Sequence, residues 1–341
     1  MGIPKNLFDF KIGTLESGKK NLISDVKGVK VGHFTLDDGS IHTGVTAILP
    51  HTGNIFREKV VAASYVINGF GKSVGLIQVD ELGTIETPII FTNTLSVGTA
   101  LSGLIKYMLK ENEDIGIRAG TVNTIVCECN DGYLNDIRCM NVKEEHVKIA
   151  IENAKNDFEE GAFGAGTGMS CFGLKGGIGS ASRIVKLDNR EYILGGIVLS
   201  NFGLKQDFIL NGKKFFTMEE EKHILLEKGS IIIVLATDIP LNERQLKRIS
   251  KRASIGLSRT GSFLGNGSGD IVISFTTSNK INHYEERDIL NMNILNENKM
   301  DLVFRAAAEV TEEAVISSLV HSKTMIGRDG NVRKSLMEFI W

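Results

Sequence analysis

The residues with the clearest chemical potential in this sequence are serines that directly follow glycine. Five such pairs occur, at 39–40, 179–180, 229–230, 261–262 and 267–268. A serine at a chain N-terminus carries its own base, because its α-amine, with a pKa of about 7.7–8.0, is partly neutral near pH 7. This chemistry requires the chain to cut itself before the serine. A preceding glycine helps, because it lacks Cβ and tolerates strained backbone angles.

The position of each pair matters, because a rigid element must aim an N-terminal nucleophile into a cleft. Only Ser230 directly begins a long apolar run, which extends to Ala236 and predicts a buried strand. Gly39–Ser40 lies in a predicted polar turn, and the pairs at 261 and 267 fall in one predicted loop. Position therefore favours Ser230 among the five, although an ordinary strand start remains the commoner meaning of such a pair.

Other catalytic patterns fit the sequence less well. The seven histidines show no metal-ligand spacing and offer no convincing base for a Ser-His-Asp triad. Residues 71–75, Gly-Lys-Ser-Val-Gly, match the G-x-S-x-G pattern of serine hydrolases, but a strand is predicted after them where that motif needs a helix. The Gly-rich segments 68–73 and 265–270 lack the spacing or the following helix of a phosphate-binding loop.

The composition is that of an ordinary globular protein. The 341 residues are 42% hydrophobic and 23% charged, with a formal net charge of −2, so no attraction for nucleic acid or an anionic membrane is indicated. No signal peptide and no run of 18 apolar residues is visible. We therefore expect a cytoplasmic protein with four reduced cysteines, and we expect no metal and no cofactor.

The elements that must position this chemistry come partly in blocks, which favours a layered α+β protein over a doubly wound sheet. Predicted strands cover Val45–Leu49, Val74–Val79, Asn123–Cys127, Ile193–Leu199, Ser230–Ala236 and Ile271–Thr276, and predicted helices cover Val97–Lys110, Lys143–Phe158, Asn242–Leu257 and Asp301–Val320. The Gly-rich stretch 159–182 contains too many apolar residues for a linker, so we expect ordered loops in a single domain.

Several segments together resemble one family of enzymes. Residues 81–98, 128–138, 164–182, 201–203, 229–277 and 306–330 are similar, in order and separation, to the DmpA/BapA family. This family comprises L-aminopeptidase/D-esterase and β-peptidyl aminopeptidase enzymes, which are self-processing serine peptidases with an N-terminal nucleophile. The resemblance implies a four-layer αββα sandwich, with a broad fold shared by ornithine acetyltransferases.

The resemblance also implies where the chain is cut. Gly229–Ser230 matches the family's self-cleavage site, so Ser230 is the expected nucleophile. The expected products are residues 1–229 and 230–341 of one domain. Ser268 and Asp270 match a serine and an acid that lie near the nucleophile's amine, although some members have glutamate at the acid position.

Three further matches concern the substrate. Asn201 corresponds to the asparagine of the oxyanion hole, and Tyr133 to a tyrosine that lines the site. Glu128 corresponds to an acid that pairs with the ammonium group of the substrate, which is costly to bury without a partner. The implied substrates are small peptides, amides or esters, and the implied assembly is a homo-oligomer, commonly a tetramer.

Two alternatives remain at the level of sequence. An acyltransferase of the ornithine acetyltransferase type shares the broad fold and also cuts itself, but its nucleophile is normally threonine, so a serine at 230 argues against it. The other alternative is a relative that neither cleaves itself nor catalyses a reaction and acts as a binding protein.

Overall fold

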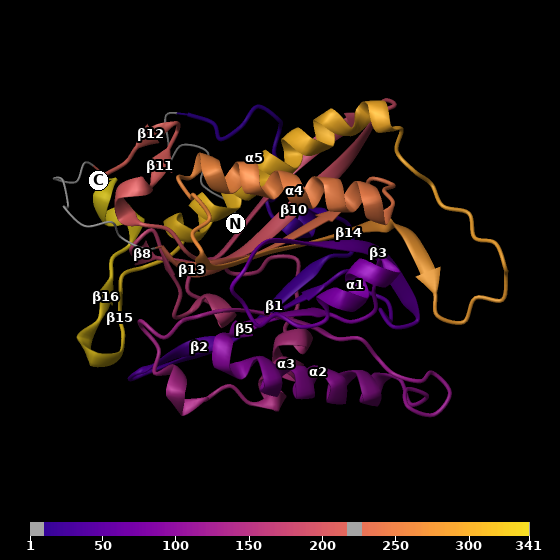
Figure 1. Cartoon of the computed structure of the whole chain (residues 1–341), viewed down its shortest axis with the longest axis horizontal. Coiled ribbons are helices and arrows are strands. Elements are labelled where there is room, and N and C mark those ends of the chain that lie inside the picture. The colour runs from indigo at the N-terminus through magenta and orange to yellow at the C-terminus, as the bar shows by residue number, and fades with distance from the viewer. Residues whose placement is uncertain (1–9, 217–226, 341) are drawn as a thin grey trace.

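Two β-sheets packed face to face form the centre of the protein (Figure 1). The computed structural model describes residues 10–216 and 227–340. The smaller sheet has the order β1 (Lys30–Asp38), β2 (Ile41–Leu49), β5 (Ile89–Asn93), β6 (Ile125–Cys129). The larger sheet has the order β4 (Thr84–Ile85), β3 (Glu58–Gly69), β14 (Gly267–Asn282), β13 (Lys228–Thr237), β10 (Arg190–Asn201), β9 (Gly177–Leu187).

Helices cover the outer face of each sheet. Helices α2 (Val97–Glu111) and α3 (Glu144–Glu152) pack on the smaller sheet, whereas α4 (Glu243–Arg259) and α5 (Met300–Val320) pack on the larger one (Figure 1). The layers therefore run helix, sheet, sheet, helix, which confirms the predicted αββα sandwich. Short two-residue strands form three further hairpins, β7 (Ser170–Cys171) with β8 (Leu174–Lys175), β11 (Ile209–Leu210) with β12 (Lys213–Lys214), and β15 (Met325–Ile326) with β16 (Val332–Arg333).

Strand β13 shows why a continuous apolar run forms the centre of this fold. Ile231, Ile233 and Leu235 belong to the core beneath α4 and α5, while Ile232 and Val234 belong to the core between the sheets. Because side chains alternate between the two faces of a strand, only a strand buried on both faces is apolar at every position. The run after Ser230 therefore specifies a central strand.

Two of the secondary-structure elements predicted from the sequence were wrong. The segment Val74–Val79, predicted as a strand, leads into helix α1 (Leu76–Leu82), which is bounded by Gly75 and Gly83, both with left-handed backbone angles. A short apolar run does not distinguish a strand from a helix. The helix predicted over 143–158 ends at Glu152, after which Lys155 pairs with Val31 in an isolated bridge.

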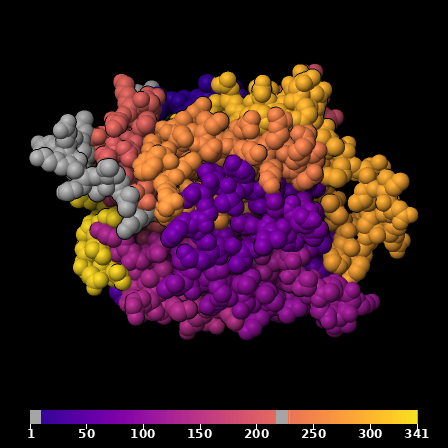
Figure 2. All heavy atoms as spheres, viewed as in Figure 1, coloured from indigo at the N-terminus to yellow at the C-terminus, as the bar shows by residue number. Residues whose placement is uncertain are grey.

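The two predicted cleavage products share one body. Figure 2 shows the N-terminal segments, indigo to magenta, meeting the orange and yellow C-terminal segments along a broad seam. Strands β13 and β14 of the C-terminal portion lie between β10 and β3 of the N-terminal portion.

No helix among the described residues is long and apolar enough to cross a membrane. Residues 1–9 of the N-terminal segment and His223 lie outside the described residues.

Candidate active site

Ser230 stands near the beginning of the central strand β13. Its side chain is buried, with 7% of the residue's surface exposed, and its Oγ accepts a hydrogen bond of 3.1 Å from the backbone N–H of Gly269. Gly269 lies opposite Ser230 on the parallel neighbour β14, and Asn201 lies opposite it on the antiparallel neighbour β10. The hydroxyl is thus held by the backbone of the neighbouring strand β14.

Gly229 is a glycine because two backbones approach closely there. A Cβ at this position would lie 2.3 Å from the carbonyl oxygen of Asn201 and 2.7 Å from Cα of Phe202. Neither atom belongs to a flexible side chain, so any other residue would push β13 away from β10. Packing therefore requires glycine immediately before Ser230.

Ser268 and Asp270 form a buried pair beside this strand. The Ser268 hydroxyl donates to Asp270 Oδ1 at 2.5 Å, and both residues are about 1% exposed. Burial raises the pKa of Asp270 to about 6, although hydrogen bonds from the Ser268 hydroxyl and the Ile231 backbone oppose the shift. Asp270 therefore contacts Ile231, the residue immediately after Ser230.

The structure corrects the prediction that Ser268 lies in a loop. Gly267 and Ser268 begin β14, directly beside Gly229 and Ser230 on β13. Two Gly-Ser pairs thus begin neighbouring parallel strands, and position alone does not separate them. Their surroundings do, because the Ser268 hydroxyl is committed to Asp270, whereas Ser230 Oγ accepts a hydrogen bond from a backbone amide.

Asn201 is held at both ends of its side-chain amide. Its Oδ1 accepts from the backbone N–H of Ser170 at 2.8 Å, and its Nδ2 donates to the carbonyl of Asn130 at 2.9 Å. An amide nitrogen carries two hydrogens, so one N–H remains for an oxyanion. By strand alternation Asn201 shares the face of Leu199, and Ser230 that of Ile232, and both faces border the core between the sheets.

Tyr133 joins the site through other side chains. The guanidinium of Arg333 lies 3.4 Å from the centre of the Tyr133 ring, and Arg333 Nε donates to Ser170 Oγ at 3.1 Å. Burial lowers the pKa of Arg333. Tyr133 is 41% exposed, and within the described residues it makes no hydrogen bond to Ser230. Its ring is therefore partly exposed and is linked to Asn201 through Arg333 and Ser170.

Glu128 is the last residue but one of β6, and the loop after β3 covers its carboxylate. Its carboxylate accepts from the backbone N–H of Lys72 at 2.8 Å and from the hydroxyl of Thr94. A Cβ on Gly71 would lie 3.4 Å from Glu128 Oε1 and 3.7 Å from Cα of Gly269, which is the strand partner of Ser230. The Glu128 carboxylate and β14, the neighbour of the strand that carries Ser230, therefore both lie close to Gly71.

The G-x-S-x-G segment was set aside for a reason that the structure overturns. It follows strand β3 and precedes helix α1, as a nucleophile elbow would. Ser73 Oγ, however, is buried and has no hydrogen-bond partner among the described residues, and burial raises the pKa of the neighbouring Cys127 thiol to about 12. A thiol that stays protonated is no general base, so the segment serves the site through Gly71 and Lys72 instead.

Sequence reasoning missed several residues that support the site. Asn68 donates through its side chain to the carbonyl of Ser268, and Phe70 donates its backbone N–H to the same oxygen at 3.2 Å. Ser170, Arg333 and Asn130 were also not singled out. The Asn68–Ser73 segment fitted a phosphate-binding loop poorly, and its two glycines were the feature of the sequence that could have marked it as part of the site. No cluster of three potential metal-binding side chains occurs among the residues that the structure describes.

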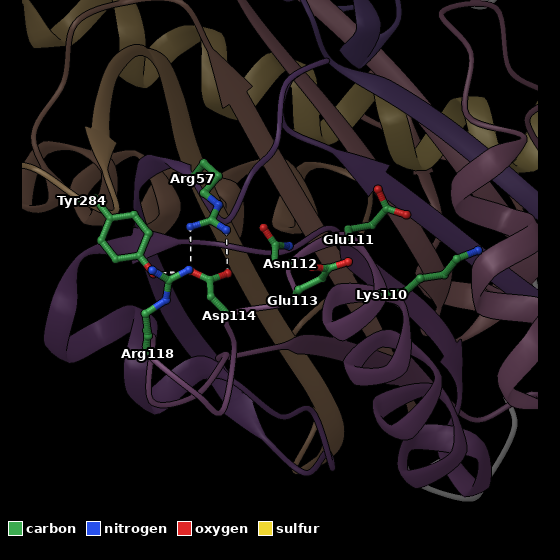
Figure 3. Close-up of a pocket in the computed structure, with 8 residues that line it drawn as sticks. All are labelled: Arg57, Lys110, Glu111, Asn112, Glu113, Asp114, Arg118 and Tyr284. Carbon is green, nitrogen blue, oxygen red and sulfur yellow. Dashed lines mark hydrogen bonds and ion pairs between the residues drawn. The ribbon is translucent and has the colours of Figure 1, made fainter.

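A separate surface pocket of about 560 Å³ lies at the far end of β14 (Figure 3). Arg57 forms a two-pronged ion pair with Asp114, and the hydroxyl of Tyr284 donates to the same carboxylate. Tyr284 lies two residues beyond the last residue of β14, whereas Ser268 is its second residue, so nearly the whole strand lies between them. The pocket is not part of the candidate active site.

A two-sheet α+β core with a Gly-Ser pair at the head of a central strand defines a class, the hydrolases with an N-terminal nucleophile. The model of peptidase family S58 matches residues 21–333, and the chain belongs to this family. It is a serine aminopeptidase with a variant of the Ntn-hydrolase fold.

Individual relatives agree with this placement. The chain is 35% identical over 339 residues to the β-peptidyl aminopeptidase BapA of Sphingosinicella microcystinivorans, across 92% of this chain and 84% of that protein. The crystal structure of the PH0078 protein from Pyrococcus horikoshii OT3 is similar with a TM-score of 0.90, 52% identity and coverage of 97% and 96%. The L-aminopeptidase D-Ala-esterase/amidase of Ochrobactrum anthropi, a prototype of the serine aminopeptidases, gives a TM-score of 0.85, 32% identity and coverage of 95% and 93%.

Proposed function

We propose that this protein cuts itself between Gly229 and Ser230 and then acts as an aminopeptidase through an acyl-enzyme on Ser230. The observation that carries the proposal is the strand register, which pairs Ser230 directly with Asn201 beside a glycine that packing requires. An activated hydroxyl and an amide donor on neighbouring strands are the two groups that acyl transfer needs.

The first step is an acyl shift within the chain. Ser230 Oγ attacks the carbonyl carbon of Gly229, the peptide C–N bond breaks, and the nitrogen takes the hydroxyl proton and becomes a free amine. Water then hydrolyses the resulting ester, leaving a carboxylate on Gly229 and a free hydroxyl on Ser230. The products are residues 1–229 and 230–341.

In the processed enzyme the α-amine of Ser230 acts as the base. It takes the hydroxyl proton as Oγ attacks the carbonyl after the first substrate residue, and it returns a proton to the leaving amine. Asn201 donates an N–H to the oxyanion, with Tyr133 beside it, and Ser268 with Asp270 holds the amine. Water, deprotonated by the same amine, then releases the acyl group.

The class of substrate follows from the protein group that binds the substrate's N-terminal ammonium. Glu128 offers a buried carboxylate near the nucleophile strand, which suits substrates with a free ammonium group. We propose small peptides, amides or esters. L-Alanyl, D-alanyl and β-alanyl p-nitroanilides, assayed side by side, decide which acyl residue fits. If the cleaved protein hydrolyses none of them but transfers an acyl group, the acyltransferase alternative replaces this proposal.

Mass spectrometry of the purified protein tests self-processing. We expect two chains that end and begin at Gly229 and Ser230, and a single chain for Ser230→Ala. The matched control is Ser40→Ala, which alters a Gly-Ser pair in the turn between β1 and β2 and should be processed normally. An intact wild-type chain at active pH, or a Ser230→Ala chain that still splits after Gly229, would overturn the proposal.

A further inference from the structure

A buried ammonium group is hydrogen-bonded to the backbone of the segment 166–176, which contacts Asn201. Lys175, in β8, is completely buried, and its Nζ donates to the backbone carbonyls of Gly166 at 3.1 Å, Met169 at 3.0 Å and Gly176 at 2.7 Å. An ammonium has three hydrogens and no acceptor, so all its donors are used. Burial lowers the pKa of Lys175 to about 7, which shows how strongly desolvation opposes a cation here.

The loop that Lys175 holds carries a direct contact to the candidate active site. Ser170 of β7 lies opposite Lys175 in the antiparallel β7–β8 pair. The backbone N–H of Ser170 donates to Asn201 Oδ1 at 2.8 Å. The three carbonyls that Lys175 binds lie before and after Ser170 in the chain, so they fix where this N–H points.

The orientation of the Asn201 amide depends on that N–H. Rotation about the last torsion of asparagine is soft, so packing alone does not decide which end carries the nitrogen. Here the N–H of Ser170 can donate only to the amide oxygen, and the carbonyl of Asn130 can accept only from the amide nitrogen. A flipped amide would place donor against donor and acceptor against acceptor.

The other support of the amide, Asn130, directly precedes a buried carboxyl group. Asp131 is fully buried, and its Oδ1 accepts from the Asn135 side chain at 3.0 Å. Burial raises the pKa of Asp131 to about 7, and the charge of Lys175 acts in the opposite direction. A buried amine therefore lies opposite Ser170, and a buried carboxyl group follows Asn130, next to the two supports of the Asn201 amide.

We propose that Lys175 is a positioning residue for catalysis, which holds the Ser170 N–H so that the Asn201 amide keeps one N–H aimed at the oxyanion. The proposal rests on the proposed function, because it gives Asn201 the oxyanion role. The ordinary alternative is that Lys175 only stabilises the fold, and the two predict different couplings to Asn201.

A double-mutant cycle separates them. Lys175→Met and Asn201→Ala are made singly and together, and kcat and KM for an alanyl p-nitroanilide are measured per cleaved chain, with the cleaved fraction taken from mass spectrometry. The rate of self-cleavage is followed in the same four proteins. Lys59→Met is the matched control, because Lys59 pairs with the buried Glu86 at 2.5 Å, away from Asn201.

We expect Lys175→Met to lower kcat at least tenfold with little change in KM, and to lower it less than threefold when Asn201 is already alanine. Lys59→Met should reduce thermal stability, leave kcat unchanged and show no coupling to Asn201. If Lys175→Met does not fold, Lys175→Gln, which keeps one donor, replaces it in the same cycle with the same expected coupling.

The failures of the two proposals are distinguishable. Equal losses from the Lys175 substitution in both Asn201 backgrounds would mean that Lys175 does not act through Asn201, and the inference would be wrong. If Asn201→Ala alone leaves kcat unchanged, the oxyanion role of Asn201 in the proposed function is wrong instead, and the inference fails with it.

Discussion

At the scale of single residues, the site is built from groups that are expensive to bury and are paired locally. Asp270 has one oxygen bonded to Ser268, while its Oδ2 has no hydrogen-bond partner among the described residues. Glu128 is satisfied by a backbone N–H and a hydroxyl, without a cation. Carboxylates held this way remain available to an amine, either that of Ser230 or that of the substrate.

Asp270 should make stability depend on pH in an unusual direction. Its pKa is about 6 in the folded protein and 3.8 ordinarily, so the folded state keeps a proton that the unfolded state releases. Stability therefore falls as pH rises from about 4 to about 6, by roughly 3 kcal/mol in all. In uncut Ser230→Ala protein, Asp270→Asn should remove this loss and raise the melting temperature at pH 7 relative to its parent, but not at pH 4.

Thermal unfolding of the two proteins from pH 4 to pH 8 measures this difference. Asp288→Asn, in the exposed loop 283–296, is the control and should leave the pH profile of its parent unchanged. A constant difference between Asp270→Asn and its parent across this range would contradict the assigned titration.

Glu128 should determine preference for a free amine. Glu128→Gln can still accept from the backbone N–H of Lys72 and can donate to the Thr94 hydroxyl, but it lacks the charge. We expect kcat/KM for alanyl p-nitroanilide to fall about 10- to 100-fold, since a charged hydrogen bond contributes roughly 1.5–3 kcal/mol. Hydrolysis of propionyl p-nitroanilide, which lacks the amine, should not change. Glu86→Gln, at another buried glutamate, should leave this selectivity intact, and an unchanged ratio in Glu128→Gln would refute the role.

At the scale of elements, the start of β13 is the critical feature. One neighbour donates the N–H of Gly269 to Ser230 Oγ and the other places Asn201 opposite Ser230, and both arrangements depend on strand register. A shift of one residue would turn Ser230 to the other face of the sheet. The close approach of Gly229 to β10 is one of the contacts that hold this register.

Gly229→Ala should therefore impair processing through geometry. The added methyl would meet backbone atoms of Asn201 and Phe202, so β13 must move away from β10 at the scissile bond. We expect self-cleavage to slow more than about tenfold, which corresponds to an activation barrier higher by over about 1.4 kcal/mol. A time course of intact mass measures this rate. Gly98→Ala, in α2 with open space around it, should be processed at the wild-type rate. Wild-type cleavage of Gly229→Ala would show that the packing is irrelevant.

At the scale of the whole molecule, the two expected fragments are interleaved. The central strands of the larger sheet belong to one fragment and their outer neighbours to the other. A buried ion pair also joins them, because Arg183 of β9 contacts Glu309 at 3.1 Å and Glu313 at 2.5 Å on α5. Separating the fragments would expose both cores that flank β13.

Fragments 1–229 and 230–341 should therefore elute together in native chromatography and separate only in denaturant. Arg183→Met leaves two buried carboxylates without their cation, which should cost about 3–5 kcal/mol and lower the urea midpoint of separation. Lys186→Met removes an exposed pair with Glu16 and should have little effect. Fragments that part without denaturant, or an unchanged midpoint in Arg183→Met, would contradict this account.

We also propose a homo-oligomer, a tetramer by resemblance. Its support in the structure is the exposed loop 283–296, where Ile289, Met292 and Ile294 face outward. Light scattering of the native protein should give four times the mass of one chain, and a monomer would refute the proposal.

Sequence by itself determined the central strand, the layered α+β class and the set of residues that define the family. An uninterrupted apolar run permits only burial on both faces, and the Gly-Ser, Asn201 and Glu128 motifs are short and local. Tertiary structure decided the rest. It placed Ser268 on a strand beside Ser230, and it formed α1 where a strand was expected. It also joined Lys175, Ser170 and Arg333 behind Asn201. These contacts connect segments up to 163 residues apart, and side-chain contacts between distant segments leave no periodic pattern in the chain.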